Sequence, residues 1–277
     1  MTVRAVVRGV GHYLPARAVP NAEFEARLDT TDEWIRSRSG IERRHFASAE
    51  ETTSFMGAEA ARRALARAGW GADMLDAVIV ATSTPDLTFP SAATMVQKAL
   101  GMRSGFAFDL QAVCAGFVYA LTTANALIVA GQARRVAVIG AETFSKILDW
   151  TDRSTCVLFG DGAGAVLLEA AEGDGTAADR GVLSADLNSD GTFRDLLYVD
   201  GGIGAGHPGH LRMEGREVFR HAVEKLALTA EAALRRAGLT GADVDWIVPH
   251  QANLRIIKAT AQKMGVPMER VVVTVQD

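Results

Sequence analysis

The sequence predicts an α/β fold built from two related halves, and three observations lead to that prediction. Short runs rich in β-branched residues alternate along the chain with alanine-rich segments of helical length. Several of these runs are continuously apolar, which is typical of strands in sheets covered by helices on both faces. A series of several elements also occurs twice in the same order, which indicates an internal duplication.

Strands are expected where short apolar runs lie between turn-forming residues. The expected strands are residues 3–9, 77–81, 105–110, 136–140, 163–169, 181–188, 246–248 and 271–275. Helices are expected in the alanine-rich segments at residues 31–37, 54–68, 92–100, 116–130, 215–237 and 253–264.

The duplication is seen in two stretches that match element by element. Residues 64–70 resemble residues 233–239, and each stretch is followed by Gly-Ala-Asp, a strand, and a helix containing Gln-Lys. We therefore expect an N-terminal half at residues 1–172 and a C-terminal half at 173–277. The strand at 271–275 matches the one that precedes Cys114, and the chain stops at Asp277, so the second half is expected to be truncated.

The composition limits the function classes that fit this chain. Its 277 residues are 48% hydrophobic and 22% charged, with a mean hydropathy of +0.10, which is ample for a large core. A net charge of −4 argues against a nucleic-acid-binding protein. The two cysteines form neither a disulfide framework nor a metal-binding pattern. With no signal peptide or membrane span apparent, a cytoplasmic location is expected.

Cys114 is the leading candidate for a nucleophile. It follows an apolar strand-like run and stands where an apolar helix begins. The unpaired N–H groups and positive dipole end of a helix start favour a thiolate, which is the reactive form. The alternative is that Cys114 is a small buried core residue, as many free cysteines are.

His250 is the candidate partner of Cys114. It follows Pro249 at the end of an expected strand in the second half, and strand ends from the two halves would converge at a pseudo-twofold interface. An imidazole there can exchange a proton with the thiol or donate a hydrogen bond to a carbonyl oxygen. A core histidine with satisfied hydrogen bonds is the alternative.

Residues 109–121 and 248–257 resemble the condensing enzymes of the thiolase fold, and within them 3-oxoacyl-[acyl carrier protein] synthase III. The resemblance runs over the whole chain, including Thr31–Ile41, Thr151–Arg153 and Met213–Gly215. It implies a duplicated five-layer αβαβα fold, a homodimer and an acyltransferase that starts fatty-acid synthesis. No permanently bound cofactor is implied, because acetyl-CoA is a substrate and acyl carrier protein is the partner.

The resemblance also assigns roles to single residues. Cys114 matches the acyl-accepting nucleophile, and His250 matches the histidine that hydrogen-bonds the malonyl thioester. Trp34 and Arg153 match a pair that holds the adenine of CoA, and Arg38 matches a contact to a CoA phosphate.

Further matched positions line the substrate path or the surface that receives the carrier protein. Gly215 and Asn253 match groups in the pantetheine tunnel. Phe89 matches a residue that reaches into the partner subunit's acyl pocket, and Leu158 is expected to line an acyl pocket. The expected docking surface for the acidic carrier protein consists of Arg220, Gln251, Ala252, Asn253, Leu254 and Arg255.

The family has an asparagine in a His-Gly-Asn-Thr-Ser-like motif that would begin directly after Asp277. A chain without it is expected to condense malonyl groups more slowly, on the order of 10²-fold or more, since a hydrogen-bond donor is missing. Two other hypotheses stay open: a thiolase-fold acyltransferase of specialised ketide metabolism, and an inactive fragment that binds CoA or carrier protein. The acyl donor that reacts with Cys114 distinguishes the ketide hypothesis. Retention of Cys114 and His250 argues against the inactive fragment, whereas a missing C-terminal segment argues for it.

Overall fold

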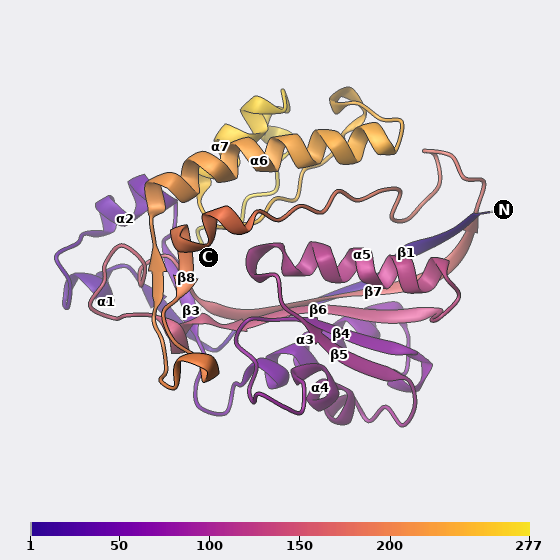
Figure 1. The fold of residues 1–277 in the computed structure, drawn as a ribbon, viewed down its shortest axis with the longest axis horizontal. Coiled ribbons are helices and arrows are strands. Elements are labelled where there is room, and N and C mark those ends of the chain that lie inside the picture. Colours follow the sequence, from indigo (N-terminus) through magenta and orange to yellow (C-terminus); the bar gives the residue numbers. More distant parts are fainter. Residues whose placement is uncertain (1) are drawn as a thin grey trace. The chain divides into compact units, whose positions relative to one another are not determined.

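The computed structural model describes residues 2–277, and the chain divides into two units. A five-stranded mixed sheet forms the centre of unit 1 (Figure 1). Unit 1 contains the chain up to Arg17, His45–Thr143 and Asp161–Ala185. Unit 2 contains Ala18–Arg44, Phe144–Gly160 and Asp186–Asp277. Both units are discontinuous in sequence, and the expected division of the chain near residue 172 stays a prediction.

The sheet of unit 1 has the strand order β1-β7-β6-β4-β5. Its strands are β1 (Thr2–Tyr13), β4 (Ala77–Ala81), β5 (Phe106–Leu110), β6 (Arg135–Thr143) and β7 (Asp161–Gly173). β4 pairs in parallel with β5 and β6, whereas β7 runs antiparallel to both β6 and β1. Because β4, β5 and β6 are parallel, their carboxyl ends meet at one edge of the sheet.

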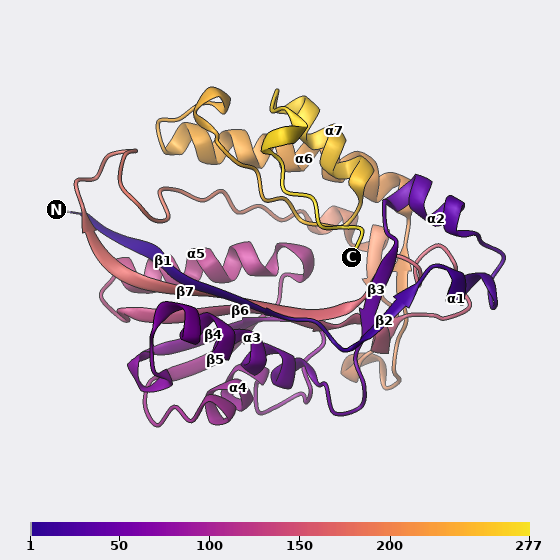
Figure 2. The same cartoon turned by 180° about the vertical axis from the view of Figure 1, so that it is seen from behind.

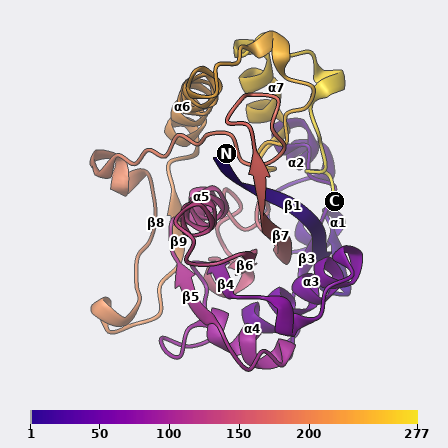
Figure 3. The same cartoon turned by 90° about the vertical axis from the view of Figure 1, so that its right-hand side faces the viewer.

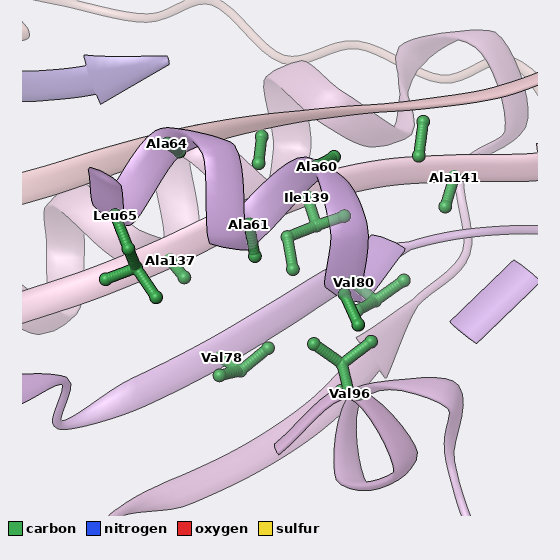
Figure 4. Packing of buried hydrophobic residues seen from close by; sticks show 14 of the residues in the cluster. Ala60, Ala61, Ala64, Leu65, Val78, Val80, Val96, Ala137, Ile139 and Ala141 are labelled. Atoms are coloured by element: carbon green, nitrogen blue, oxygen red, sulfur yellow. The ribbon is translucent and has the colours of Figure 1, made fainter. Parts of the chain in front are cut away.

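Helices cover this sheet on both faces, as the apolar strand pattern predicts (Figure 3). α3 (Thr53–Ala68) and α4 (Ala92–Leu100) pack on one face. In that cluster, alanines of α3 lie over Val78 and Val80 of β4 and Ile139 of β6 (Figure 4). α5 (Gly116–Val129) packs on the other face.

Unit 2 is mainly helical. Its helices are α1 (Ala22–Glu25), α2 (Asp32–Ser39), α6 (Gly215–Arg236) and α7 (Leu254–Lys263). α6 and α7 lie side by side, and α2 contacts α7 (Figure 2). β8 (Leu197–Val199) and β9 (Leu211–Met213) form an antiparallel pair. A further two-stranded sheet is formed by β2 (Arg17–Pro20) and β3 (Arg43–Phe46), whose residues are divided between the two units.

The six expected helices are confirmed with ends shifted by at most two residues, but three expected strands are wrong. Residues 181–188 form no strand. Residues 246–248 and 271–275 share a single parallel bridge between Ile247 and Val271, with N–H···O distances of 2.8 and 2.9 Å on its two sides. A run of β-branched residues becomes a strand only where neighbouring strands take up its hydrogen bonds.

The duplicated segments nevertheless adopt the same local structure. α3 and α6 are each followed by a left-handed glycine, Gly69 at φ 69° and Gly238 at φ 72°, and then by a 3₁₀ turn. α4 and α7 are likewise followed by the left-handed glycines Gly101 and Gly265. Glycine fits these positions because a side chain at positive φ is strained. None of the helices among residues 2–277 is long and apolar enough to cross a membrane.

Candidate active site

Cys114 lies in a short turn between the edge strand β5 and helix α5, as the sequence predicts. The turn is a 3₁₀ segment, Val113–Ala115, and α5 begins directly after it without a side-chain cap. Val113 has a φ of 48°, a left-handed conformation that a β-branched residue adopts only under strain. The strain is localised next to the cysteine, which is typical of a turn held in place for function.

The charge state of Cys114 differs from the expectation of a stabilised thiolate. The residue as a whole is exposed, but neighbouring protein atoms partly shield its sulfur from water. This desolvation disfavours the thiolate and raises the pKa of the thiol. The carboxylate of Glu142 raises that pKa further. The helix start is where the sequence places it, but desolvation and the charge of Glu142 outweigh the backbone hydrogen bond that lowers the pKa of Cys114.

Cys156 is chemically different from Cys114. It is fully buried in unit 2, and burial followed by the charge of Asp152 raises its pKa to about 11. A thiol that is both inaccessible and protonated is unreactive. Of the two cysteines, Cys114 is therefore the one available for nucleophilic attack.

His250 stands in the loop between the Ile247 bridge and α7. It is exposed along part of its surface, and burial of the rest lowers its pKa below the usual value. The imidazole is therefore neutral near pH 7, with one ring nitrogen as a donor and the other as an acceptor. A neutral imidazole can donate a hydrogen bond to a carbonyl oxygen as negative charge develops there.

Gln251 fixes the loop that carries His250. Its amide nitrogen donates to the carbonyl oxygens of Pro249 and Val272, both at 3.0 Å, and its oxygen accepts from the N–H of Thr274 at 2.7 Å. The expected role of Gln251 in binding carrier protein stays a prediction. The contacts present here tie residues 272–274 to the segment before α7.

Trp34, Arg38 and Arg153 come together in unit 2. The guanidinium carbons of Arg38 and Arg153 lie 4.5 and 5.2 Å from the centre of the Trp34 ring. Arg153 also donates to the main-chain oxygen of Asp29 and lies 3.3 Å from its carboxylate. An aromatic ring with two cations suits a ligand that combines a flat ring with phosphates.

α2 carries Trp34 and is held against α7. Thr31 caps the start of α2 by accepting from the N–H of Trp34 at 3.1 Å. The helix ends at Gly40, whose φ of 83° and close approach to Leu254 leave no room for a side chain. Asn253 caps α7 and donates to the carbonyl oxygen of Arg38 at 3.0 Å, which links the two helices.

The ion pairs that hold the segment before Arg153 are not predicted by the sequence. Arg212 on β9 donates to Asp149 and to Asp200, both at 2.8 Å. Asp149 also accepts from Thr151, and these bonds keep the pKa of its carboxyl well below the usual range. The Asp-x-Thr and Asp-x-Ser spacings at 149–151 and 152–154 are turn signals that could have identified this segment.

Positive charge gathers at one place on α6 and α7. Arg216, Glu217, Phe219, Arg220 and Val223 line one surface depression on α6. The guanidinium of Arg255 lies 5.5 Å from the centre of the Phe219 ring. Arg220 pairs with Glu217 at 2.7 Å, so part of this positive charge is neutralised within the helix.

The remaining expected site residues are placed as follows. Phe89 of unit 1 is 82% exposed, and Leu158 of unit 2 is half-buried. Gly215 is the first residue of α6, and Ala252 lies in the loop before α7. The structure thus groups the expected CoA-binding and docking residues within unit 2. Cys114 belongs to unit 1, and its pairing with His250 stays a prediction.

Comparison with known proteins gives one consistent family. The model of 3-oxoacyl-[acyl carrier protein] synthase III matches residues 108–191, and the model of its C-terminal part matches residues 234–277. A β-ketoacyl-[acyl carrier protein] synthase III of Cereibacter sphaeroides is 74% identical over all 277 residues, which cover 86% of its own length. A Ruegeria pomeroyi protein of the same name is 73% identical with the same coverage.

Solved structures agree with the sequence comparison. The 3-oxoacyl-[acyl carrier protein] synthase III of Aquifex aeolicus superposes with a TM-score of 0.92 at 42% identity, over 99% of this chain and 85% of that one. The priming β-ketosynthase of the R1128 polyketide pathway superposes with a TM-score of 0.88 at 37% identity, over 99% and 83%. These similarities confirm the expected α/β, thiolase-like fold class.

The contrast between the two cysteines can be tested by alkylation. Iodoacetamide at pH 8 is expected to modify Cys114 and to leave Cys156 untouched, because Cys156 is buried and its pKa is about 11. Mass spectrometry of tryptic peptides measures both sites, with urea-unfolded protein as the control in which both react. Equal modification of the two cysteines in the folded protein would contradict this description.

Proposed function

Because the chain belongs to the 3-oxoacyl-[acyl carrier protein] synthase III family, we propose that Cys114 and His250 carry the condensing reaction of these acyltransferases. The reaction joins acetyl-CoA to malonyl-acyl carrier protein, gives acetoacetyl-acyl carrier protein, CoA and CO₂, and initiates fatty-acid synthesis. The observation that supports these residue roles most strongly is the position of Cys114, an exposed residue in a strained turn at the start of α5.

In the first half-reaction, the sulfur of Cys114 attacks the carbonyl carbon of acetyl-CoA. The carbon–sulfur bond to CoA breaks, and CoA leaves as a thiolate that takes up the proton lost by Cys114. Because the pKa of Cys114 is raised, the proton stays on the resting enzyme until the donor is bound. The uncapped N–H groups at the start of α5 can stabilise negative charge on the attacked oxygen.

In the second half-reaction, the malonyl group loses CO₂ and the resulting enolate attacks the acetyl carbon on Cys114. The bond between that carbon and sulfur breaks, which regenerates the thiolate. His250, neutral near pH 7, donates a hydrogen bond to the thioester oxygen on which the enolate charge develops. This half-reaction therefore needs His250, whereas acetyl transfer to Cys114 does not.

The substrate-binding residues follow from the same proposal. Trp34 and Arg153 hold the adenine of CoA, Arg38 contacts a phosphate, and Gly215 and Asn253 line the pantetheine path. The gathering of two cations at the Trp34 ring supports this assignment. Phe89, which is strongly exposed, and Leu158 are proposed to shape the acyl pocket.

The carrier protein is proposed to dock on α6 and α7. The depression lined by Arg216, Phe219 and Arg220, with Arg255 over Phe219, supports this surface. A local group of cations steers an acidic partner even on a chain with a net charge of −4. The homodimer and the cytoplasmic location are part of the proposal as properties of the family.

The division of labour can be tested with His250→Ala. Acetyl transfer from acetyl-CoA, measured as CoA release in the first turnover, is expected to stay within about three-fold of the parent protein. Formation of acetoacetyl-acyl carrier protein is expected to slow about 10²- to 10³-fold, the usual cost of losing such a hydrogen-bond donor. His12→Ala, at an exposed position of β1, is the control. Equal losses in both half-reactions would contradict the proposed role.

The CoA site can be tested with Trp34→Ala. Loss of a ring that stacks on a base costs about 1–3 kcal/mol, so the Kd for CoA is expected to rise at least about five-fold. Calorimetric titration measures it, and Trp246→Ala, another tryptophan of unit 2 that is 64% exposed, serves as the control. If the two variants bind CoA equally well, Trp34 does not hold the adenine.

The acyl donor distinguishes the ketide-type alternative. If acetyl-CoA gives no adduct on Cys114 but another acyl-CoA does, that alternative is favoured.

A further inference from the structure

Glu142 is a carboxylate to which the family resemblance assigns no role. It is the second-to-last residue of β6, at the edge of the sheet where the parallel strands β4, β5 and β6 end. It is partly buried and follows Gly140 by two residues. Side chains two apart on a strand point to the same face, so Glu142 and Gly140 share a face of the sheet.

Four hydrogen bonds converge on this carboxylate from the three residues that follow β4. One oxygen accepts from the N–H of Ser83 at 2.8 Å and from its hydroxyl at 2.7 Å. The other accepts from the hydroxyls of Thr82, at 3.3 Å, and Thr84. Four donors on one carboxylate match its full set of in-plane acceptor positions in the ionised form.

The directions of these bonds are set by the backbone. The hydroxyl oxygen of Thr82 accepts from the N–H of Thr84 at 3.1 Å, and that of Thr84 accepts from the N–H of Thr143 at 2.8 Å. Because both hydroxyl oxygens accept from these backbone N–H groups, each hydroxyl can donate its own proton to the carboxylate of Glu142. Residues 82–84 are thus a loop fixed by the carboxylate rather than by regular secondary structure.

The same loop borders the turn that carries Cys114. The N–H of Thr82 donates to the carbonyl oxygen of Leu110, the last residue of β5, at 3.1 Å. A side chain on Gly116 would lie 3.3 Å from the Cβ of Ala81, and one on Gly140 would lie 3.5 Å from the ring of Phe117. The first turn of α5 therefore rests on the ends of β4 and β6, on the face toward which Glu142 points.

We propose that Glu142 is a positioning residue for Cys114, which fixes the loop 82–84 against the end of β5 and places a negative charge beside the thiol. The inference rests on the proposed function, since it gives Glu142 a part in acetyl transfer to Cys114. Glu142 itself does not touch the substrate. It acts through the loop and through its charge.

The other charged groups on the elements around Cys114 are directed elsewhere. Asp109 on β5 accepts from the N–H groups of Ala92 and Ala93 at the start of α4, on the opposite face. Arg135 stands at the far end of β6, where it pairs with Glu169. β4 and α5 carry no charged residue. Among the charged groups of β4, β5, β6 and α5, Glu142 is thus the one that acts on the thiol, in keeping with its effect on the pKa of Cys114.

Glu142→Gln tests the proposal, because it removes the charge and replaces an acceptor with a donor at nearly constant shape. The pH midpoint for alkylation of Cys114 by iodoacetamide is expected to fall, with a rate about two- to ten-fold higher below the midpoint. Acetyl transfer, measured as acetyl adduct on Cys114 in single turnovers, is expected to slow about ten-fold or more, because the turn is no longer held. Glu172→Gln, the same change at the opposite end of the sheet, is the control.

Two further variants separate charge from position. Glu142→Asp keeps the charge but cannot reach all four donors, so it should leave the alkylation midpoint unchanged and still slow acetyl transfer. Ser83→Ala removes one donor without a change of charge and should slow acetyl transfer a few-fold at an unchanged midpoint. Slow acetyl transfer in both variants, whatever their thermal stability, supports positioning.

Acetyl transfer by Glu142→Gln at the rate of the control, or an alkylation midpoint unchanged from the control, would overturn the proposal. The proposed function fails in a different way. If Cys114 is not the acyl acceptor, then even the parent protein forms no acetyl adduct at this residue, while alkylation still reports its pKa.

Discussion

The parallel pairing of β4 with its two neighbours determines where the chemistry of unit 1 can occur. Every residue of β4 is buried, and it holds β5 on one side and β6 on the other in the same direction. The carboxyl ends of the three strands therefore meet at one edge, and the loops that leave them are neighbours. The Cys114 turn, the loop 82–84 and Glu142 come from three different strands and still form one cluster. Their proximity follows from the register of the sheet.

Unit 2 places its functional groups by helix contacts and ion pairs instead. α2 carries Trp34 and Arg38, and the amide of Asn253 ties it to α7. Arg212, held by two aspartates, fixes the segment that leads to Arg153. These bonds are local and partly exposed, so each contributes little stability alone, but together they set the positions of the residues proposed to bind CoA.

Much of this could be predicted from the sequence, for identifiable reasons. Helix ends follow from caps and glycines that act within a few residues, as Gly40 does for α2 and Gly101 for α4. Cys114 can be recognised from the sequence because a strand, a small-residue turn and an apolar helix are contiguous in the chain. The strand expected at 271–275 was wrong because strand formation depends on partners distant in the sequence. Glu142 was missed for the same reason, since Ser83 is 59 positions away from it along the chain.

The pKa of Cys114 cannot be predicted from the sequence, because burial and the Glu142 carboxylate raise it, a backbone hydrogen bond lowers it, and only the fold shows their balance. The central claim is that this thiol accepts the acyl group. Peptide mapping after a single turnover with isotopically labelled acetyl-CoA tests it most directly, with Cys114→Ser alongside. The account predicts the label on the Cys114 peptide and none in the variant. Label on another residue, or equal labelling of the variant, would contradict it.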